Sequence, residues 1–417
     1  MRVSFAVSSK LVLLATIATI AVPAGGARSA SPSPIMPDIV LLNRVTWGAT
    51  ESSVAQLRLM GREQWLDWQL HPTEADRLPP AAQAQIDALS ISQQPMAALV
   101  ADLAARAKAA NQITDPAEKQ LARQARQQAL TDLSRQASTR QILRDLYAPT
   151  QLREQMTWFW FNHFNLHQYK SDIRAMVGDY EDRAIRPRAL GRFRDLLAAT
   201  VRHPAMLRYL DNAENAAGHI NENYAREIME LHTMGVGSGY TQHDVEELAR
   251  CLTGLGIDPR PEGPRLRSEL QSQLVRDGLF EFNPARHDDG DKVFLGQTIK
   301  GRGLAEVDEV IDILSRHPAT ARHISQQLAI FFVADAPPPA LVEQMAQAFL
   351  QSDGDIAQVL RTMFYAPEFA NSAGWKFKDP IHFVLSAVRL AYGDKIILNT
   401  APIQGWLNRM AEGIYNH

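Results

Sequence analysis

Residues 221–254 read Asn-Glu-Asn-Tyr-Ala-Arg-Glu-Ile-Met-Glu-Leu-His-Thr-Met-Gly-Val, then Gly-Ser-Gly, then Tyr-Thr-Gln-His-Asp-Val-Glu-Glu-Leu-Ala-Arg-Cys-Leu-Thr-Gly. At 100° per residue, Tyr224, Ile228 and Leu231 fall on one arc of a helix, and polar residues collect on the opposite arc. Gly235, just past the last periodic residues, is a natural C-terminal stop. The first half of the stretch therefore predicts an amphipathic helix.

The second half of the stretch predicts another helix. Thr241 is a typical N-cap, and Asp244 three residues later approximates a capping box, which prefers Glu or Gln at that position. Val245, Leu248 and Leu252 recur at helical spacing and predict its buried face. Together the two halves predict a helix–loop–helix unit that is unusually dense in ionisable and amide side chains. We interpret this unit as the functional centre of the chain.

A polar seam of Glu222, Arg226 and Glu230 runs along the first helix as two i,i+4 pairs of opposite charge. Composition alone favours a solvated helix face, in which each pair contributes roughly 0.2–0.5 kcal/mol. The alternative, which we expect, is that the seam is buried against the aromatic helix at residues 158–165. In that arrangement the guanidinium of Arg226 bridges both carboxylates.

His232 falls on the apolar side of the first helix, about 140° around the helix axis from Glu227. One helix therefore does not easily aim His232, Glu227 and Glu230 at a single metal ion. The His-Glu-x-x-His spacing of zinc-binding helices is absent from the chain.

The most aromatic segment spans residues 151–166 and contains Trp158, Phe159, Trp160, Phe161 and Phe164. Aromatic residues on all sides of a helix predict a buried central helix. His163 and His167 are i,i+4 partners on one face of this helix and form a candidate metal pair. A buried histidine that is satisfied by a backbone or carboxylate partner is the favoured alternative.

Residues 278–299 differ from the rest of the chain because two short apolar runs, 279–282 and 293–295, flank an Asp289-Gly290 turn signal. This pattern predicts one small β-hairpin. The loop from His287 to Asp291 suggests calcium, but it lacks the EF-hand spacing and its closing Glu, so a plain polar turn is favoured.

The remaining segments predict helices, so the fold class is mainly α: a single compact multi-helix domain with one small β-hairpin. No strands alternate with the helices, which excludes a parallel sheet. Residues 82–147 predict a long helical hairpin, and residues 100–147 of it are expected to project as an arm. Six apolar residues of the hairpin are expected to face inward: Leu121, Leu130, Leu133, Ile142, Leu143 and Leu146.

The N-terminus predicts export. Arg2 and Lys10 give a basic start, residues 11–24 are apolar, and Ala27 fits the residue before a cleavage site. We therefore expect residues 1–27 to be a Sec-type signal peptide, because the Arg-Arg pair of the twin-arginine route is absent. An uncleaved membrane anchor is the alternative, but the apolar run is only marginally long enough. The mature chain is then periplasmic or secreted and has no stable membrane span.

Composition limits the partners and the chemistry of the mature chain. Residues 28–40 predict a Ser/Pro linker, and residues 41–417 form the helical domain. The net charge is −3 and no basic patch stands out, so nucleic acid is not expected as a partner. The single cysteine, Cys251, excludes an intramolecular disulfide and is more typical of a core residue than of a nucleophile.

Residues 221–254 and eight further parts of the chain resemble one family of secreted bacterial proteins, which is designated domain of unknown function 1800. The similar parts are residues 41–48, 160–165, 179–191, 210–212, 282–284, 287–296, 316–322 and 367–369. The resemblance covers nearly the whole mature chain. Residues 406–417 look like a family helix that leads into a further segment, so we expect the C-terminus at His417 to be truncated.

The resemblance and the polar residues together give two hypotheses. In the first, the protein is a hydrolase-type enzyme with a buried polar site, in which Glu227 or Glu230 acts as general acid or base with His163 or His287 as its partner or as a metal ligand. The candidate binding residues are Asn162, Asn223, Arg226, His232, Asp244, Arg250, Asp288 and Lys292. The cofactor is left open, and a divalent metal is considered but not favoured.

In the second hypothesis the protein is a non-catalytic secreted binding or assembly partner. The resemblance implies as its partner a sulfatase- or phosphatase-like protein of the sister family numbered 1501. Geometry discriminates between the two hypotheses. Convergence of the four candidate catalytic side chains on an open pocket favours the enzyme, whereas their pairing within a closed core favours the binding protein.

Overall fold

The computed structural model describes residues 36–73 and 77–416, and the predicted signal peptide and most of the predicted linker lie outside these residues. Helices make up 63% of the structure and strands 5%, which confirms the mainly α fold. Within the described residues, no helix is both long enough and apolar enough to cross a bilayer.

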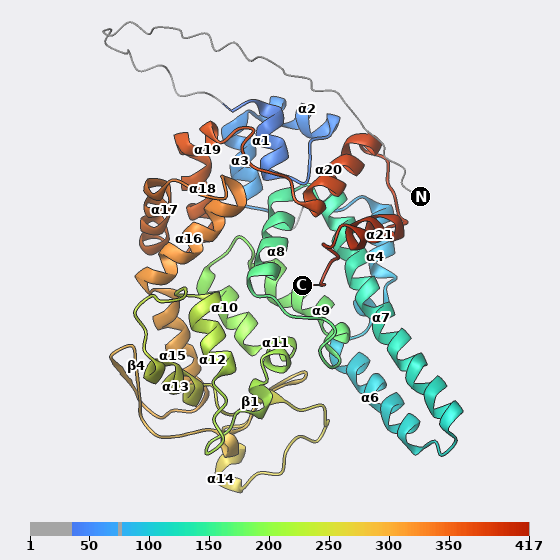
Figure 1. Cartoon of the computed structure of the whole chain (residues 1–417), viewed down its shortest axis with the longest axis vertical. Coiled ribbons are helices and arrows are strands. Elements are labelled where there is room, and N and C mark those ends of the chain that lie inside the picture. Colours follow the sequence, from blue (N-terminus) through green and yellow to red (C-terminus); the bar gives the residue numbers. More distant parts are fainter. Residues whose placement is uncertain (1–35, 74–76, 417) are drawn as a thin grey trace, which may run out of the picture.

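Helices from the two ends of the chain lie side by side at one end of the molecule (Figure 1). The first three are α1 Asp38–Val45, α2 Glu51–Met60 and α3 Arg62–Leu70. Their neighbours are α16 Pro318–Phe332, α17 Pro339–Gln351, α18 Ile356–Tyr365 and α19 Pro367–Asn371. Arg361 of α18 pairs with Asp67 of α3 at 2.9 Å, so residues almost 300 positions apart hold this layer together.

A helical hairpin extends away from the body of the molecule (Figure 1). Its base contains α4 Pro80–Asp87 and α5 Ser90–Gln93, and its two long members are α6 Met96–Gln112 and α7 Pro116–Tyr147. The Asp115 side chain caps α7 by accepting from the amide of Glu118. Of the six residues expected to face inward, Leu121 lies near the tip and is exposed, because the tip has no packing partner there, and the other five are buried.

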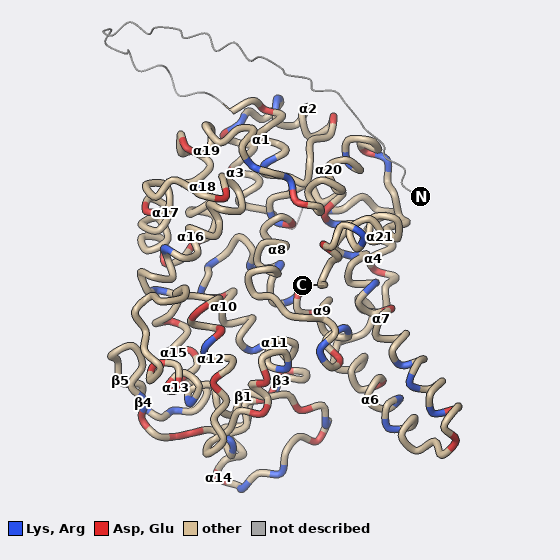
Figure 2. Tube along the Cα trace, viewed as in Figure 1, with Lys and Arg blue, Asp and Glu red and all other residues tan. Residues whose placement is uncertain are grey.

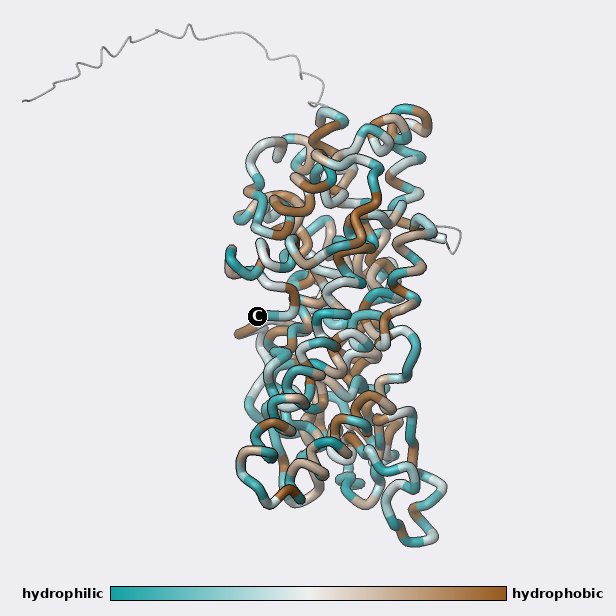
Figure 3. Tube along the Cα trace, turned by 90° about the vertical axis from the view of Figure 1, so that its right-hand side faces the viewer, coloured by the Kyte–Doolittle hydropathy of each residue, from teal (hydrophilic) through white to brown (hydrophobic). Residues whose placement is uncertain are grey.

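Helix α8, Gln151–His163, lies in the middle of the molecule, as its aromatic residues predict (Figure 1). Trp160 and Phe161 are fully buried in one large hydrophobic core. The elements that follow α8 are η1 Ile173–Ala175, α9 Val177–Asp179, η2 Tyr180–Ile185, η3 Arg186–Arg188, α10 Phe193–Arg202, α11 Pro204–Tyr209 and η4 Asn212–Glu214. Hydrophobic positions recur along the helices of the body (Figure 3).

The two helices predicted from residues 221–254 are present. The first begins as α12, Asn223–Glu227, and continues as a π-helical turn, η5, Ile228–His232, while the second is α13, Gln242–Cys251. Thr241 and Asp244 form the predicted capping box.

The π-helical turn changes which residues of the first helix are buried. Thr233 Oγ1 donates to the carbonyl of Ile228 at 2.7 Å, which satisfies a carbonyl at this helix end. Because a π turn contains an extra residue, the phase of the helix shifts after Ile228. Leu231, expected in the apolar arc, is 52% exposed and His232 is buried in its place.

Within the described residues, five short strands form two small antiparallel sheets. β1 Leu255–Ile257, β3 Phe280–Phe282 and β2 Val275–Asp277 lie in the order β1-β3-β2, and β4 Lys292–Phe294 pairs with β5 Gln297–Ile299. The expected pairing of residues 279–282 with 293–295 across Asp289-Gly290 is therefore wrong. The structure has two hairpins instead of one: β2 and β3 are joined at Gly278 and Leu279, and β4 and β5 are joined at Leu295 and Gly296. Leu295 and Gly296 both have positive φ, as a two-residue hairpin loop requires.

The remaining helices are α14 Ser268–Gln271, α15 Leu304–Ser315, α20 Pro380–Tyr392 and α21 Ala401–Arg409. Helices α20 and α21 pack against each other beside the base of the arm (Figure 1).

Candidate functional site

The structure places most of the candidate polar residues in three separate groups, and residues 221–254, which we call the signature stretch, contribute to the first two. The first group is the seam on α12. Arg226 Nη2 lies 3.2 Å from Glu222 Oε2 and 2.7 Å from Gln242 Oε1, and its Nη1 lies 3.4 Å from Glu230 Oε1. The Arg226 side chain is 39% exposed, so the expected burial of the seam against residues 158–165 is wrong. His163 and Phe164, at the end of the aromatic helix, contact the ring of His232 instead of the charged seam.

The other two polar residues of α12 also have ordinary surroundings. The pKa of Glu227 is raised by partial burial and by the nearby charge of Glu230. The Asn223 side-chain amide donates to the carbonyl of Leu210 at 3.2 Å and so tethers the start of the helix.

Replacing Arg226 by alanine should change the free energy of unfolding by no more than about 1 kcal/mol, because surface ion pairs contribute little. Urea unfolding of the parent and the variant at neutral pH measures this difference. A loss of several kcal/mol would show that the seam is desolvated in solution.

The second group consists of three histidines, of which His232 is buried and His163 and His323 are partly exposed. His163 Nε2 donates to the carbonyl of His232 at 3.0 Å, and the His163 ring centroid lies 6.3 Å from that of His232 and 6.0 Å from that of His323. Burial lowers the pKa of His163 to about 4, and burial together with the charge of His163 lowers that of His232 to about 3. These two rings are therefore neutral at physiological pH.

His323 was not predicted from the sequence, because the similar segment at residues 316–322 ends one residue before it. His167 is not part of the group, because α8 ends at His163 and the expected i,i+4 relation is lost. The side-chain amide of Asn162 donates within its own helix to the carbonyl of Trp158 at 2.8 Å.

The third group is a buried ionic cluster of His287, Lys292 and Glu306, whose side chains are fully buried. Glu306 Oε1 lies 3.0 Å from His287 Nε2, and Glu306 Oε2 lies 2.5 Å from Lys292 Nζ. The backbone amides of Arg302 and Gly303 also donate to Glu306. Burial alone would raise the pKa of Glu306, but the hydrogen bonds from His287 and Lys292 hold it below its ordinary value. Every oxygen of this carboxylate is thus occupied by the protein itself.

Side chains of helix α13 bind the β4–β5 hairpin, which carries Lys292 of this cluster, and the loop before it. Arg250 forms a two-point ion pair with Asp288, with Nε to Oδ2 at 2.9 Å and Nη2 to Oδ1 at 3.0 Å, and these bonds lower the pKa of Asp288. Asp244 Oδ1 accepts from the amide of Leu295 at 2.8 Å, and Glu247 Oε2 accepts from the amide of Val293 at 2.7 Å. The loop at Asp288 and the turn at Leu295 are therefore held in place by Arg250 and Asp244.

The four candidate catalytic side chains belong to different groups among the described residues. Glu230 belongs to the seam, with Glu227 beside it on α12, whereas His163 belongs to the histidine group and His287 to the buried ionic cluster. Within residues 36–73 and 77–416, no three His, Cys, Asp or Glu side chains are grouped as metal ligands would be. Cys251 is buried, and burial raises the pKa of its thiol to about 12, which makes it a weak nucleophile.

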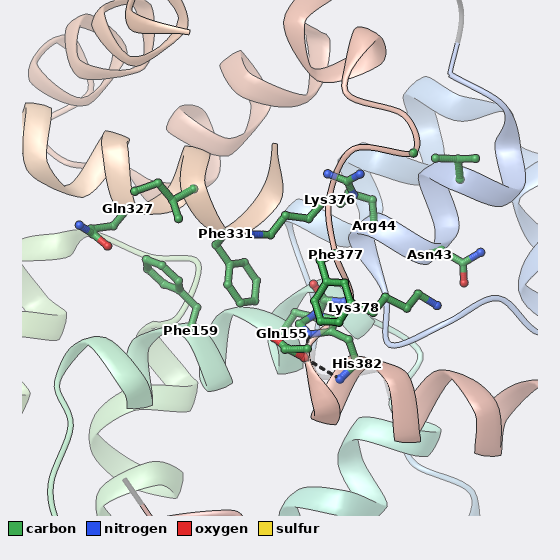
Figure 4. A pocket seen from close by; sticks show the side chains of 14 residues that line it. Asn43, Arg44, Gln155, Phe159, Gln327, Phe331, Lys376, Phe377, Lys378 and His382 are labelled. Atoms are coloured by element: carbon green, nitrogen blue, oxygen red, sulfur yellow. Dashed lines mark hydrogen bonds and ion pairs between the residues drawn. The ribbon is translucent and has the colours of Figure 1, made fainter. Parts of the chain in front are cut away.

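A pocket of about 370 Å³ lies away from the signature stretch, between α1, α8, α16 and the loop that leads into α20 (Figure 4). We call it the Gln155 pocket. Its lining includes Arg44, Gln155, Phe159, Phe331, Lys376, Phe377, Lys378, Asp379 and His382. The amide of Gln155 is fully buried, and neither its nitrogen nor its oxygen has a hydrogen-bond partner among the described residues. A buried unpaired polar group typically costs about 1–3 kcal/mol, so Gln155 needs a specific explanation.

The charges around the Gln155 pocket are unevenly paired. Asp379 is bound by His382 at 2.6 Å, and Lys376 pairs with the exposed Asp335 at 2.5 Å. Arg44 donates to the carbonyls of Phe332 and Val333, and Lys378 donates to the hydroxyl of Ser386.

Burial lowers the pKa of Arg44, and no carboxylate of the described residues pairs with Arg44 or Lys378. The charged stretch of the loop before α20 is visible in Figure 2. The sequence did not reveal this pocket, because its residues come from four distant segments.

Residues 40–417 match the family model described as "Protein of unknown function (DUF1800)". No curated protein and no solved structure matches the chain. Because the match spans nearly all of the described residues, the chain belongs to the DUF1800 family.

Proposed function

We propose that the chain is a binding protein whose Gln155 pocket takes an organic acid with an apolar body. The observation that carries this proposal is the fully buried, unpaired amide of Gln155 in a pocket with two cations that lack carboxylate partners. A bound ligand would satisfy the amide, which both donates and accepts hydrogen bonds.

The apolar lining of the pocket supports the expectation that the ligand has an apolar body. Figure 4 shows the rings of Phe159, Phe331 and Phe377 around the middle of the pocket, with Arg44 and Lys376 on one side and Gln155 and His382 on the other. Ligand pockets of this size are typically lined by apolar and aromatic side chains with a few polar groups that fix orientation. An anionic group beside the cations and a ring or acyl chain against the phenylalanines fit this arrangement.

Of the two functional hypotheses, the geometry favours binding over hydrolysis. General acid–base catalysis needs the acid and the base within reach of the same reacting atoms. The carboxylate of Glu230 pairs with Arg226 in the partly exposed seam, Glu227 lies beside it on α12, and His287 is fully engaged by Glu306 and Thr253. The signature stretch is better explained as the structural centre of the fold than as an active site.

Calorimetric titration with anilinonaphthalene sulfonate, an aromatic sulfonate, tests the proposed pocket. We expect saturable one-to-one binding that weakens about tenfold or more in Lys378→Met, because a charge-assisted hydrogen bond contributes about 1.5–3 kcal/mol. Lys395→Met is the matched control, since Lys395 likewise forms no ion pair within the described residues and does not line the pocket. Equal binding by the parent and both variants would contradict the proposal.

Replacing Gln155 by methionine should stabilise the unliganded protein by about 1–2 kcal/mol, because it removes two unpaired buried polar atoms and keeps the side-chain volume. The same change should weaken binding of the sulfonate. Urea unfolding and calorimetry of one preparation measure both effects. A variant that is less stable than the parent would mean that the amide of Gln155 is already satisfied in the free protein.

Export is part of this proposal. We expect the protein, expressed with its full N-terminus in a Gram-negative host, to appear in the periplasmic or extracellular fraction with Arg28 as its first residue. N-terminal sequencing of the purified protein checks this expectation. An intact N-terminus in the membrane fraction would favour the uncleaved anchor instead.

The partner implied by the family resemblance, a sulfatase- or phosphatase-like protein of sister family 1501, also stays a prediction. Co-expression of the two proteins should give a stable complex that light scattering resolves from the free chains. Separate elution of both proteins at micromolar concentration would contradict this partnership.

A further inference from the structure

Helix α20 presents an apolar surface to solvent. Phe383, Leu390 and Tyr392 are all exposed, and Leu390 is 78% exposed. Its only permanently charged residue, Arg389, is buried instead and donates to the backbone carbonyls of Gly48 and Leu146. Helix α20 also buries an apolar stripe of Ile381, Val384, Leu385 and Val388, so it is apolar on both sides, whereas an ordinary surface helix is polar on its outer side.

The apolar surface continues onto neighbouring elements. A groove of about 430 Å³ runs between α20 and α21, where Trp406 and Met410 are partly exposed. The loop before α20 reads Trp-Lys-Phe-Lys at residues 375–378, and Trp375 and Phe377 are each 82% exposed. We call these elements together the α20 face: the loop, the exposed side of α20 and the exposed side of α21.

The border of the α20 face is cationic. Lys378, Lys395 and Arg409 form no ion pair within the part of the chain that the structure describes. The acidic groups nearby are already engaged. The carboxylate of Asp379 is bound by His382, and that of Asp394 accepts from Ser52.

The third acidic group, Glu412, accepts from the amide of Ile381, and burial raises its pKa to about 7. The α20 face therefore combines an apolar centre and unneutralised cations at its edge.

We infer that the α20 face docks on a lipid surface that carries anionic headgroups. Trp and Tyr prefer the level of the headgroups, where an apolar ring and a polar edge are both accommodated, and Lys and Arg at the border pair with lipid phosphates. The alternation of aromatic and lysine residues at 375–378 fits insertion of single rings below a headgroup plane. A flat protein partner would gain less contact from two rings that protrude separately from a loop.

Cosedimentation with vesicles tests this inference. Vesicles of phosphatidylcholine and phosphatidylglycerol should bind the parent protein, and high salt should release it because the Debye length shortens. Leu390→Ser should weaken binding severalfold. Leu59→Ser is the matched control, because Leu59 is 86% exposed on the distant helix α2 and should bind as the parent does. Lys395→Gln should weaken binding about fivefold, which corresponds to one cation near an anionic surface.

Three results would overturn the inference. The first is a protein that stays in the supernatant both with the mixed vesicles and with vesicles of phosphatidylcholine alone. The second is equal binding to vesicles of phosphatidylcholine alone, which would remove the role of the cations. The third is a dimer in light scattering that Leu390→Ser disperses, since the α20 face would then be an interface between two copies. The loop residues 376–378 also line the Gln155 pocket, whereas Leu390 and Lys395 do not, so variants of these two residues test the α20 face separately from the sulfonate titration.

Discussion

Replacing Glu306 by glutamine should lower the free energy of unfolding by about 3–5 kcal/mol at neutral pH, because it leaves the buried ammonium of Lys292 without its counter-charge. In the parent, Glu306 neutralises Lys292 at 2.5 Å and also accepts from His287 at 3.0 Å, with both partners fully buried. Urea unfolding of the parent and the variant measures the difference. The cluster joins β4 to α15, so its loss should weaken the whole signature region.

Two further variants separate the charge effect from a general effect of substitution. Glu309→Gln on the same helix removes an ion pair with Arg302 at the surface, and it should cost less than about 1 kcal/mol. The double change of Lys292 and Glu306 to methionine should cost less than Glu306→Gln alone, because an apolar pair leaves no charge buried without a partner. A Glu306→Gln variant as stable as Glu309→Gln would show that water reaches the cluster.

The second large effect is a pH dependence carried by His163. Its pKa is about 4 in the folded protein because of burial, against roughly 6.5 when unfolded. Between these values the unfolded chain binds more protons, so stability falls as the pH falls. From neutral pH to about pH 5, the parent should lose about 2 kcal/mol more than a His163→Phe variant. Urea unfolding at both pH values checks this, and parallel losses would show that His163 is solvated.

Glu181 should make the stability of the protein rise as the pH falls, which is opposite to the effect of His163. Burial raises its pKa to about 7, although Arg140 and the hydroxyl of Tyr415, which donates to its carboxylate at 2.6 Å, lower it in part. The folded protein therefore binds a proton that the unfolded chain releases above about pH 4.5, and stability rises as the pH falls through this window. Glu181→Gln should lack this gain of about 2 kcal/mol at about pH 5. His232 should act in the same direction as His163, and Glu412 in the same direction as Glu181, so only the variants isolate the contributions of His163 and Glu181 from the profile of the parent.

The features that the sequence predicted correctly are local. The mainly α fold, the Thr241 capping box and the buried aromatic helix α8 all follow from spacing within one or two helical turns. The Leu231 prediction was wrong because helical periodicity assumes 3.6 residues per turn, and a π turn at residues 228–232 breaks that assumption.

The features that the sequence did not reveal depend on tertiary contacts. His287, in a loop, contacts Glu306 of helix α15, and no sequence-spacing rule predicts this contact. The Gln155 pocket joins Arg44 to Lys376 across more than three hundred residues, and Gln155 itself is a single polar residue on a buried helix. The seam was expected to be buried because charge density alone does not determine which side of an amphipathic helix faces the core. The His287–Glu306 contact, the Gln155 pocket and the exposure of the seam all depend on how the helices pack together in the folded chain.

A crystal structure of the protein with anilinonaphthalene sulfonate would show where this ligand binds. The binding proposal predicts the sulfonate beside Arg44 and Lys378, the rings against Phe159 and Phe331, and a hydrogen bond between the ligand and the amide of Gln155. Ligand density that lies only on the α20 face or among the signature residues, with the Gln155 pocket filled by neighbouring side chains, would contradict the proposal.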